Sequence, residues 1–243
     1  MTTRRLPTSG DDPSGSRHME RVAQAEMRRL MNSFITALVQ AYRDGKPLES
    51  AGQKEEAALM KSVAKWTDKA DAQGLKKSTQ ILHNVGIDIE LGPQGLDPGT
   101  LDHLRSIVQQ DVLSLTADTR AAVGRVIANG YDQGLGVRDI ARQVMAETDM
   151  SRSRAAMIAQ TTIMKTINAE AQDRYARAGA VGMYIMPASD DRVCPRCLAA
   201  AYVGNTDRLQ FYRSVSLPIH PRCRCTVIPA MSEDEVYRMP RVL

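Results

Sequence analysis

Apolar residues recur at steps of three and four along most of the chain, which is the spacing of one face of an α-helix. The first clear case lies between residues 18 and 42, at Met19, Ala23, Met27, Leu30, Phe34, Leu38 and Tyr42. This pattern predicts a long amphipathic helix, and Asp44-Gly45-Lys46-Pro47 follows it as an end signal. Its methionines would form either an ordinary core stripe or an adaptable docking face.

A second helix is predicted from Gln53 to Gln73. Gly74 is expected to break or kink it, because glycine is a poor helix former. Residues 76–85 are predicted to continue as helix. Residues 86–99 place Gly, Pro and Asp at turn-like spacing, which predicts a loop.

The middle of the chain is a run of predicted helices at residues 101–115, 118–130, 137–144 and 151–178. Asp118 and Ser151 are suited to capping two of these helices at their first turns. Gly179 is suited to ending the last one in a left-handed conformation. Small residues dominate this last helix, so another element can pack close to its backbone.

After Gly179 the pattern changes to short β-branched and aromatic runs. Residues 181–186 and the run from Arg224 to Ile228 predict two strands, with Pro229 ending the second. Side chains two apart on a strand share a face, so Cys223 and Cys225 should point the same way. Residues 232–235 then begin a short predicted helix with acidic residues.

The predicted fold class is mainly α with a small C-terminal α+β cysteine-rich module, whose sheet stacks on the helix at residues 151–178. The expected regions are a flexible arm at 1–17, a helical region at 18–100, a domain at 101–229 that contains the cysteine-rich module at 190–229, and a tail at 230–243.

Composition favours a soluble protein with a real core, since the chain has 243 residues and 43% hydrophobic content. Charged residues interrupt every apolar run well short of the roughly 18 residues needed to span a bilayer. The segment from Met1 to Arg17 lacks the apolar middle of a secretion signal. We therefore expect synthesis in the cytoplasm and no membrane partner.

All four cysteines lie near the C-terminus, in the pairs Cys194/Cys197 and Cys223/Cys225. Two short pairs separated by a loop have the spacing of a structural zinc site, in which each pair forms one knuckle. His220 is an alternative ligand, because its gap to Cys223 equals the gap between Cys194 and Cys197. Five candidate ligands thus compete for four places around a zinc ion.

Two other chemistries of the cysteines stay open. They form disulfides or remain buried thiols if no metal binds, or one pair acts as a thioredoxin-like dithiol, since Cys-Pro-x-Cys is typical of that site. The redox reading leaves the second pair unexplained. A zinc deaminase is a weaker reading of these cysteines than either of these.

Arginines are concentrated around the cysteines. Residues 192–228 contain Arg192, Arg196, Arg208, Arg213, Arg222 and Arg224 against one acid, Asp207. The four nearest the cysteines, Arg192, Arg196, Arg222 and Arg224, are candidates for contact with nucleic acid or an acidic partner. The alternative is that they solvate a small module with few aromatics.

Catalysis has little support in the sequence. Apart from the cysteines and His220, the chain shows no nucleophile elbow, phosphate loop or His-x-x-x-His pair. We predict no catalytic residues and no enzymatic activity.

Several short motifs occupy the second half of the chain: Arg154-Ala155-x-x-Ile158-Ala159-Gln160-Thr161, Asn168-Ala169, Tyr175-x-x-x-Gly179, Asp191-Arg192-Val193-Cys194-x-x-Cys197 and His220-Pro221-x-Cys223-Arg224-Cys225. In combination they resemble the phage head morphogenesis family, the minor capsid proteins similar to the F protein of phage Mu. The resemblance covers residues 116–229. Tyr184 stands where the family usually has tryptophan, and no glycine follows Cys197 closely.

The resemblance implies a minor head protein of a tailed bacteriophage, made in the host cytoplasm and incorporated at or near the portal vertex. It implies a part in prohead assembly and in DNA packaging or exit. The expected partners are the portal protein, major capsid or neck proteins, and packaged DNA. The alternative function is a DNA-binding zinc-knuckle protein that contacts the genome through the arginines of its C-terminal module.

Overall fold

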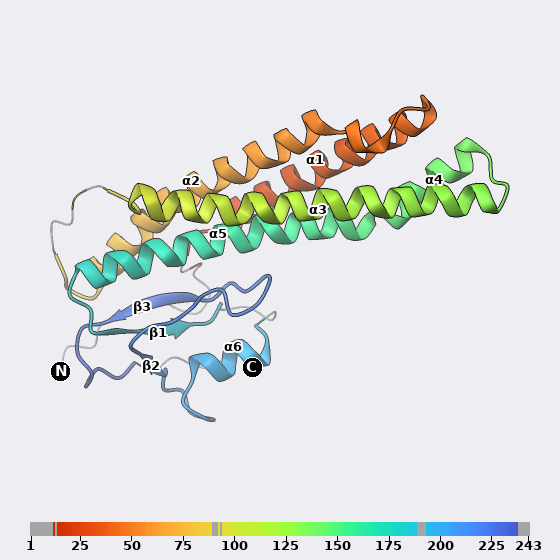
Figure 1. Ribbon diagram of the computed structural model, residues 1–243. Coiled ribbons are helices and arrows are strands. Elements are labelled where there is room, and N and C mark those ends of the chain that lie inside the picture. The colour runs from red at the N-terminus through yellow and green to blue at the C-terminus, as the bar shows by residue number, and fades with distance from the viewer. Residues whose placement is uncertain (1–11, 13, 89–91, 93, 189–192, 238–243) are drawn as a thin grey trace. The chain divides into compact units, whose positions relative to one another are not determined.

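The computed structural model of the chain describes residues 12, 14–88, 92, 94–188 and 193–237. The described chain divides into two compact units. The first contains residues 1–18, 67–101 and 161–243, and the second contains residues 19–66 and 102–160. Four long helices contribute to both units: α1 Arg17–Arg43, α2 Gln53–Asn84, α3 Pro98–Asp132 and α5 Asp149–Arg177 (Figure 1).

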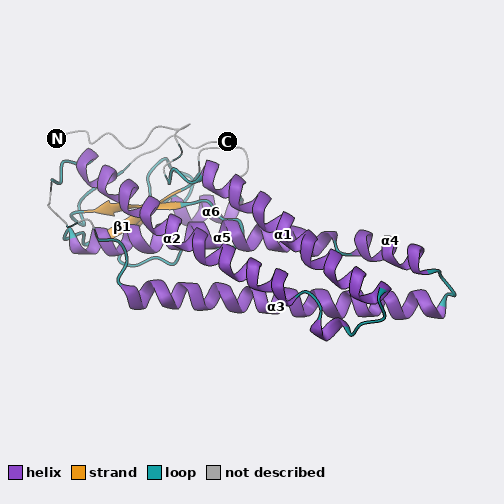
Figure 2. Ribbon diagram, turned by 90° about the horizontal axis from the view of Figure 1, so that it is seen from above, coloured by secondary structure: helices purple, strands orange, loops and turns teal. Residues whose placement is uncertain are grey.

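The second unit is a helical bundle with an apolar interior. Its core is formed by fully buried residues from several helices, namely Met27, Met31, Phe34, Leu59, Val112, Leu115, Val123, Ile140 and Val144. The last two belong to the short helix α4, Val137–Glu147, and a single 3-10 turn, η1 Leu48–Ser50, precedes α2. The methionines at 27 and 31 are therefore core residues, not a docking face. Figure 2 shows the helices α1 to α5 as purple ribbons.

Polar contacts join neighbouring helices of this bundle. Glu26 on α1 accepts hydrogen bonds from Ser62 and Trp66 on α2. Arg120 on α3 forms an ion pair of 2.9 Å with Glu56 on α2. Because most of these groups lie at the edge of the apolar core, they fix which faces meet more than they add stability.

Two predictions about helix boundaries were wrong. Helix α2 runs through Gly74 without a break, and a Cβ at this position would lie 2.9 Å from the Cβ of Glu170 on α5. Gly74 is thus a point of close helix approach in the first unit. The predicted helices at 101–115 and 118–130 form one helix, α3, since no glycine or proline separates them.

The predicted small sheet is confirmed in the first unit. Its strands are β1 Gly182–Met186, β2 Phe211–Tyr212 and β3 Thr226–Ala230, in the antiparallel order β2-β1-β3. Tyr175 and Ala178 at the end of α5 share a buried cluster with Tyr184 and Ile228 of the sheet. Gly179 ends this helix region with a left-handed φ of 85°, as predicted.

The C-terminal strand differs from its prediction in both bounds. It begins at Thr226, so Cys223 and Cys225 precede it, and it continues through Pro229. Proline fits there because β3 is an edge strand. The helix predicted from Ser232 is wrong, because residues 231–237 form turns and irregular backbone.

The part of the predicted N-terminal arm that the structure describes is packed. Ser14 and Ser16 are buried, and the Ser16 hydroxyl donates to the sulfur of Met164 on α5. Gln73 on α2 donates to the carbonyl of Ser14. Residues 1–11 and 13 of this arm, and 238–243 of the tail, lie outside the described residues.

Among the described residues, none of the helices combines the length and the apolar character that crossing a bilayer requires.

Candidate metal centre

The first arm of the site is built at the start of a helix. Cys194 is the N-cap of α6, Pro195–Ala201, with proline at the first helical position. The Cys194 sulfur accepts a hydrogen bond from the backbone N–H of Cys197 at 3.4 Å. This capping turn places Cys197, one turn along the helix, on the same side as Cys194.

The second arm is a tight turn. The backbone N–H of Cys223 donates to the carbonyl of His220 at 3.0 Å. Arg222 within this turn has a φ of 64°, which is uncommon for a residue other than glycine. The turn brings the side chains of His220 and Cys223 toward the first arm.

The two arms converge on one cavity. The Nε2 atom of His220 lies 3.2 Å from the Cys194 sulfur and 3.1 Å from the Cys197 sulfur. The sulfurs of Cys197 and Cys223 are 3.8 Å apart. Cys197, Cys223 and Cys225 also form a group with all sulfurs within 4.8 Å of one another. A cavity of about 20 Å³ lies among these residues, which is room for one water-sized sphere.

These distances fit the ligands of one tetrahedral ion. With Zn–S near 2.3 Å and Zn–N near 2.0–2.1 Å, two ligand sulfurs are about 3.8 Å apart and a sulfur and a nitrogen about 3.6 Å. The Cys197–Cys223 separation matches the first value, and the histidine contacts are somewhat shorter than the second. The Cys/His clusters can therefore hold a metal ion.

The histidine is oriented for ligation through Nε2. Its Nδ1 atom lies 2.7 Å from the carbonyl of Pro221, which accepts a hydrogen bond only if Nδ1 carries the proton. The lone pair is then on Nε2, facing the sulfurs. Metal-binding histidines are commonly held by such a bond on the other ring nitrogen.

The thiols affect one another's protonation. Hydrogen bonds from Cys197 and Cys225 lower the pKa of Cys223 well below its ordinary value. Hydrogen bonds with Cys197 and Cys223 raise the pKa of Cys225, and the hydrogen bond with Cys223 raises the pKa of Cys197. Burial raises the pKa of Cys194, but hydrogen bonds from the backbone of Cys197 and Arg196 lower it by more. The site thus favours a thiolate on each arm.

The four cysteines are free thiols. The closest sulfur contact between the arms, 3.8 Å from Cys197 to Cys223, is well above the S–S bond length of about 2.05 Å. All five candidate ligands lie together, although the strand expected to align Cys223 and Cys225 starts only after them. The turn from His220 to Cys223 places these two cysteines near the first arm instead.

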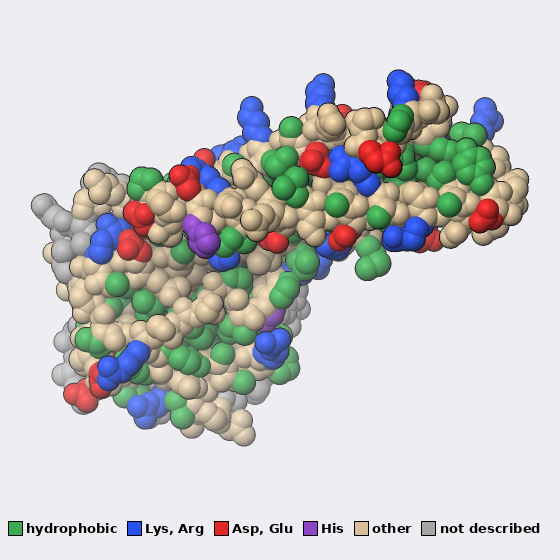
Figure 3. Space-filling model, viewed as in Figure 1, with side chains coloured by type: hydrophobic (Ala, Val, Ile, Leu, Met, Phe, Trp, Pro, Cys, Tyr) green, Lys and Arg blue, Asp and Glu red, His purple; other side chains and the backbone are tan. Residues whose placement is uncertain are grey.

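The candidate arginines lie beside this site. Arg222 and Arg224 line the same cavity as the cysteines, and Arg196 and Arg222 are exposed. Arg192 lies outside the described residues. On the face of the module shown in Figure 3, Lys and Arg side chains stand apart from one another and do not merge into one patch.

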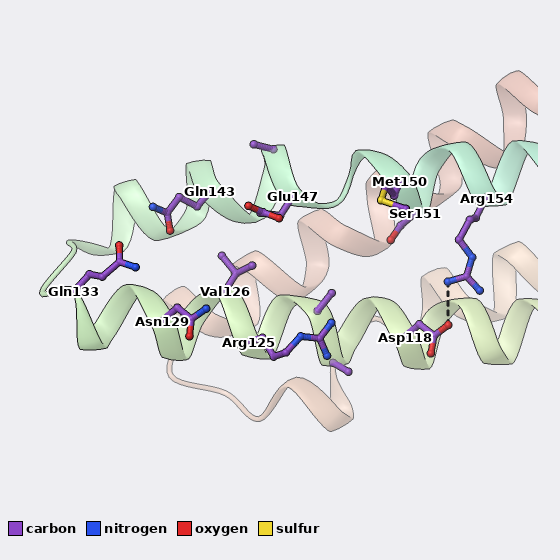
Figure 4. A pocket seen from close by; sticks show the side chains of 13 residues that line it. Asp118, Arg125, Val126, Asn129, Gln133, Gln143, Glu147, Met150, Ser151 and Arg154 are labelled. Atoms are coloured by element: carbon purple, nitrogen blue, oxygen red, sulfur yellow. Dashed lines mark hydrogen bonds and ion pairs between the residues drawn. The ribbon is translucent and has the colours of Figure 1, made fainter.

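A second hollow lies in the helical bundle, between α3 and the segment formed by α4 and the start of α5. Figure 4 shows Arg125 and Asn129 of α3, and Gln133 just after this helix, across the hollow from Gln143 and Glu147 of α4. Asp118 is paired to Arg154 at 2.9 Å. Its lining mixes both charges and amides.

Sequence reasoning named three residues of α5 as parts of motifs but gave them no place in the site. Thr161, Asn168 and Tyr175 of α5 each bond to the backbone of the second arm or the strand that follows it. Their steps of seven residues were visible in the sequence, since every seventh residue of a helix lies on nearly the same face. The sequence did not show which segment of the chain this face contacts.

A family model described as "Phage Mu protein F like protein" matches residues 121–228. This region of the chain is similar to that family. The Mu F-like region contains all five candidate ligands and all of α5. Neither the curated proteins nor the solved structures include a significant match to the chain.

The family indicates a phage head morphogenesis protein, which is a structural protein of the virion. The resemblance seen in the sequence motifs is therefore confirmed for this region, and its bounds lie within the predicted 116–229.

Proposed function

We propose that the chain is a minor capsid protein at or near the portal vertex of a tailed phage, in which one zinc ion closes the C-terminal module of the Mu F-like region. The convergence of five metal-binding side chains on one cavity carries the zinc part of the proposal. The family supports the head-protein part.

Zinc is favoured over other ions by the ligand chemistry. Thiolate and imidazole ligands in a tetrahedral arrangement are typical of structural zinc. Cys194, Cys197 and Cys223 are three ligands in this proposal. His220 is the fourth, because its Nε2 lies within 3.2 Å of two of the sulfurs, and Cys225 is the alternative.

Elemental analysis of the purified protein, combined with a thiol count under denaturing conditions, tests the metal. We expect about one zinc per chain and four free thiols. Cobalt substitution then distinguishes the fourth ligand: His220→Ala should change the visible spectrum of bound Co²⁺, whereas Cys225→Ser should leave it as in the wild type. If the protein contains no metal and no free thiols, the zinc site is contradicted and the cysteines form disulfides.

The proposed location needs a test in particles. Chemical cross-linking of purified proheads followed by mass spectrometry should join the chain to the portal protein. The absence of the chain from proheads, or cross-links to capsid subunits alone, would contradict a place at the portal vertex. Without a cross-link to the portal protein, the proposed roles at the portal, in packaging and in genome exit would all lose their support.

A second candidate function is contact with packaged DNA, supported by six arginines against one acid in residues 192–228. DNA binding by phosphate contact weakens steeply as salt rises. Replacing Arg196 and Arg222 with glutamine should then reduce both affinity and its salt dependence. Equal DNA binding by the double variant would remove these residues from the interface.

A further inference from the structure

Helix α5 contacts the second metal-binding arm through three side chains on one face. The backbone N–H of Arg222 donates to the hydroxyl of Thr161 at 3.4 Å. The amide nitrogen of Asn168 donates to the carbonyl of Cys225 at 3.0 Å. The hydroxyl of Tyr175 donates to the carbonyl of Val227 at 3.5 Å. The three positions are seven residues apart, so the helix face follows the arm from its turn into β3.

Asn168 is the only one of the three that bonds to a candidate metal ligand. It is fully buried, and its amide nitrogen also donates to the carbonyl of Met164 one turn earlier on α5 at 2.8 Å. Because both partners are carbonyl oxygens, they settle which end of the amide points toward them. Asn168 thus ties the helix backbone to the Cys225 peptide.

The other end of this amide is left unsatisfied. The Oδ1 atom of Asn168 is buried and has no hydrogen-bond partner. A buried acceptor without a partner is unfavourable. Asparagine is therefore poorly explained as a packing residue at this position, and its donor group is what the site uses.

We propose that Asn168 is a positioning residue of the metal site, and that its bond to the Cys225 carbonyl sets the direction of the arm that carries Cys223 and Cys225. This inference rests on the proposed metal function. Asn168 does not touch the ion. It acts by fixing the peptide next to the ligands, in the way that outer-shell partners orient ligands in metal sites.

The test is competition for zinc between the protein and a chromophoric chelator, with full-length wild type, Asn168→Ala and Asn168→Leu. Both variants lack the amide donor, but leucine fills the space that alanine leaves empty. We expect each to bind zinc about 10–100-fold more weakly, which is the usual effect of losing an outer-shell partner.

Tyr175→Phe is the matched control. It also removes one bond from α5 to the backbone of the same segment, but at Val227, which is not a ligand. We expect its zinc affinity to equal that of the wild type, even if its thermal stability falls. A general effect of loosening α5 would lower the zinc affinity of all three variants, and that result would overturn the proposal.

The outcomes separate this inference from the function beneath it. Wild-type protein that takes up no zinc contradicts the metal site itself. Wild-type protein that binds zinc, with both Asn168 variants binding equally well, contradicts only the positioning role. If Asn168→Ala does not fold, the zinc affinity of Asn168→Leu decides the test, because leucine fills the space at residue 168.

Discussion

The helical bundle of residues 19–66 and 102–160 and the cysteine-rich module of residues 182–230 obtain a fixed interior in different ways. The bundle buries apolar side chains from every helix, among them Phe34, Leu115 and Ile140. The module has one helix of seven residues and strands of two to five. It buries an apolar cluster around its sheet, and its two arms meet at side chains that could hold a metal ion.

The difference lies in the cluster of potential metal ligands, which the bundle does not show among its described residues. Apolar burial spreads stability over many residues, so each contributes a modest part. A metal centre concentrates it in four ligands. The two regions should therefore respond very differently to single substitutions.

The largest expected effect is at Cys197, which belongs to both groups of potential ligands. Structural zinc sites contribute an apparent free energy of about 10–16 kcal/mol in small domains. Cys197→Ser should forfeit a large part of it, so that limited proteolysis cuts between residues 193 and 230 while circular dichroism keeps most of its helical signal. Val203→Ser, at an exposed position of the same module, serves as the control. Unchanged protease resistance of Cys197→Ser would contradict a structural role for the site.

The complementary experiment disturbs the bundle. Phe34 is fully buried, with Arg120 over its ring at 5.0 Å. Phe34→Ala should lower the free energy of unfolding by about 3–5 kcal/mol, measured by denaturant titration. Leu113→Ala, at a half-exposed position of α3, should change it by no more than about 0.5 kcal/mol.

Zinc content should stay at the wild-type level in Phe34→Ala under native conditions. A parallel loss of zinc would show that the bundle and the module do not differ in the way described above.

A third experiment uses pH on the part of α5 that packs against the module. Burial, together with the nearby charge of Asp71, raises the pKa of Glu170 from 4.5 to about 7. Between these values the unfolded chain releases this proton and the folded chain keeps it, so stability should fall as pH rises from 4.5 to 7 and level off above. Since one unit of pKa corresponds to about 1.4 kcal/mol, the full loss is about 3 kcal/mol.

Glu170→Gln keeps the shape of this side chain and removes its titration. Its stability relative to the wild type should rise between pH 5 and pH 8 in urea titrations. Glu147→Gln, at an exposed position of α4, should follow the wild-type profile. If Glu170→Gln and Glu147→Gln both follow the wild-type profile, the assigned role of Glu170 is ruled out.

The smallest effect concerns the close approach of α2 and α5. A Cβ at Gly74 would lie 2.9 Å from the Cβ of Glu170 and 3.1 Å from the carbonyl of Ile167. Gly74→Ala should therefore cost about 1–3 kcal/mol through overpacking, although alanine is the better helix former. Gly124→Ala in α3, where nothing lies within 4 Å of an added Cβ, should instead stabilise by about 0.4–1 kcal/mol. Equal changes in the melting temperatures of both variants would contradict the close contact.

Periodicity was sufficient to predict most of the long helices, because amphipathic spacing records which face of a helix is buried. It failed at Gly74, where low helix propensity suggested a break but the helix is continuous and packs closely against Glu170. It also failed between residues 115 and 118, where a cap signal occurs inside a continuous helix. Both errors arose because local preference is weak compared with tertiary packing.

The sequence by itself determined the candidate ligands, their grouping in two arms and the family resemblance, since these depend only on residue type and spacing. Tertiary structure decided what spacing cannot encode. It placed His220 against both Cys194 and Cys197, and it brought Asn168 to the carbonyl of Cys225, 57 residues away. Such contacts depend on how the chain turns at Arg222 and on which face of α5 meets the arm, and only the folded chain sets these.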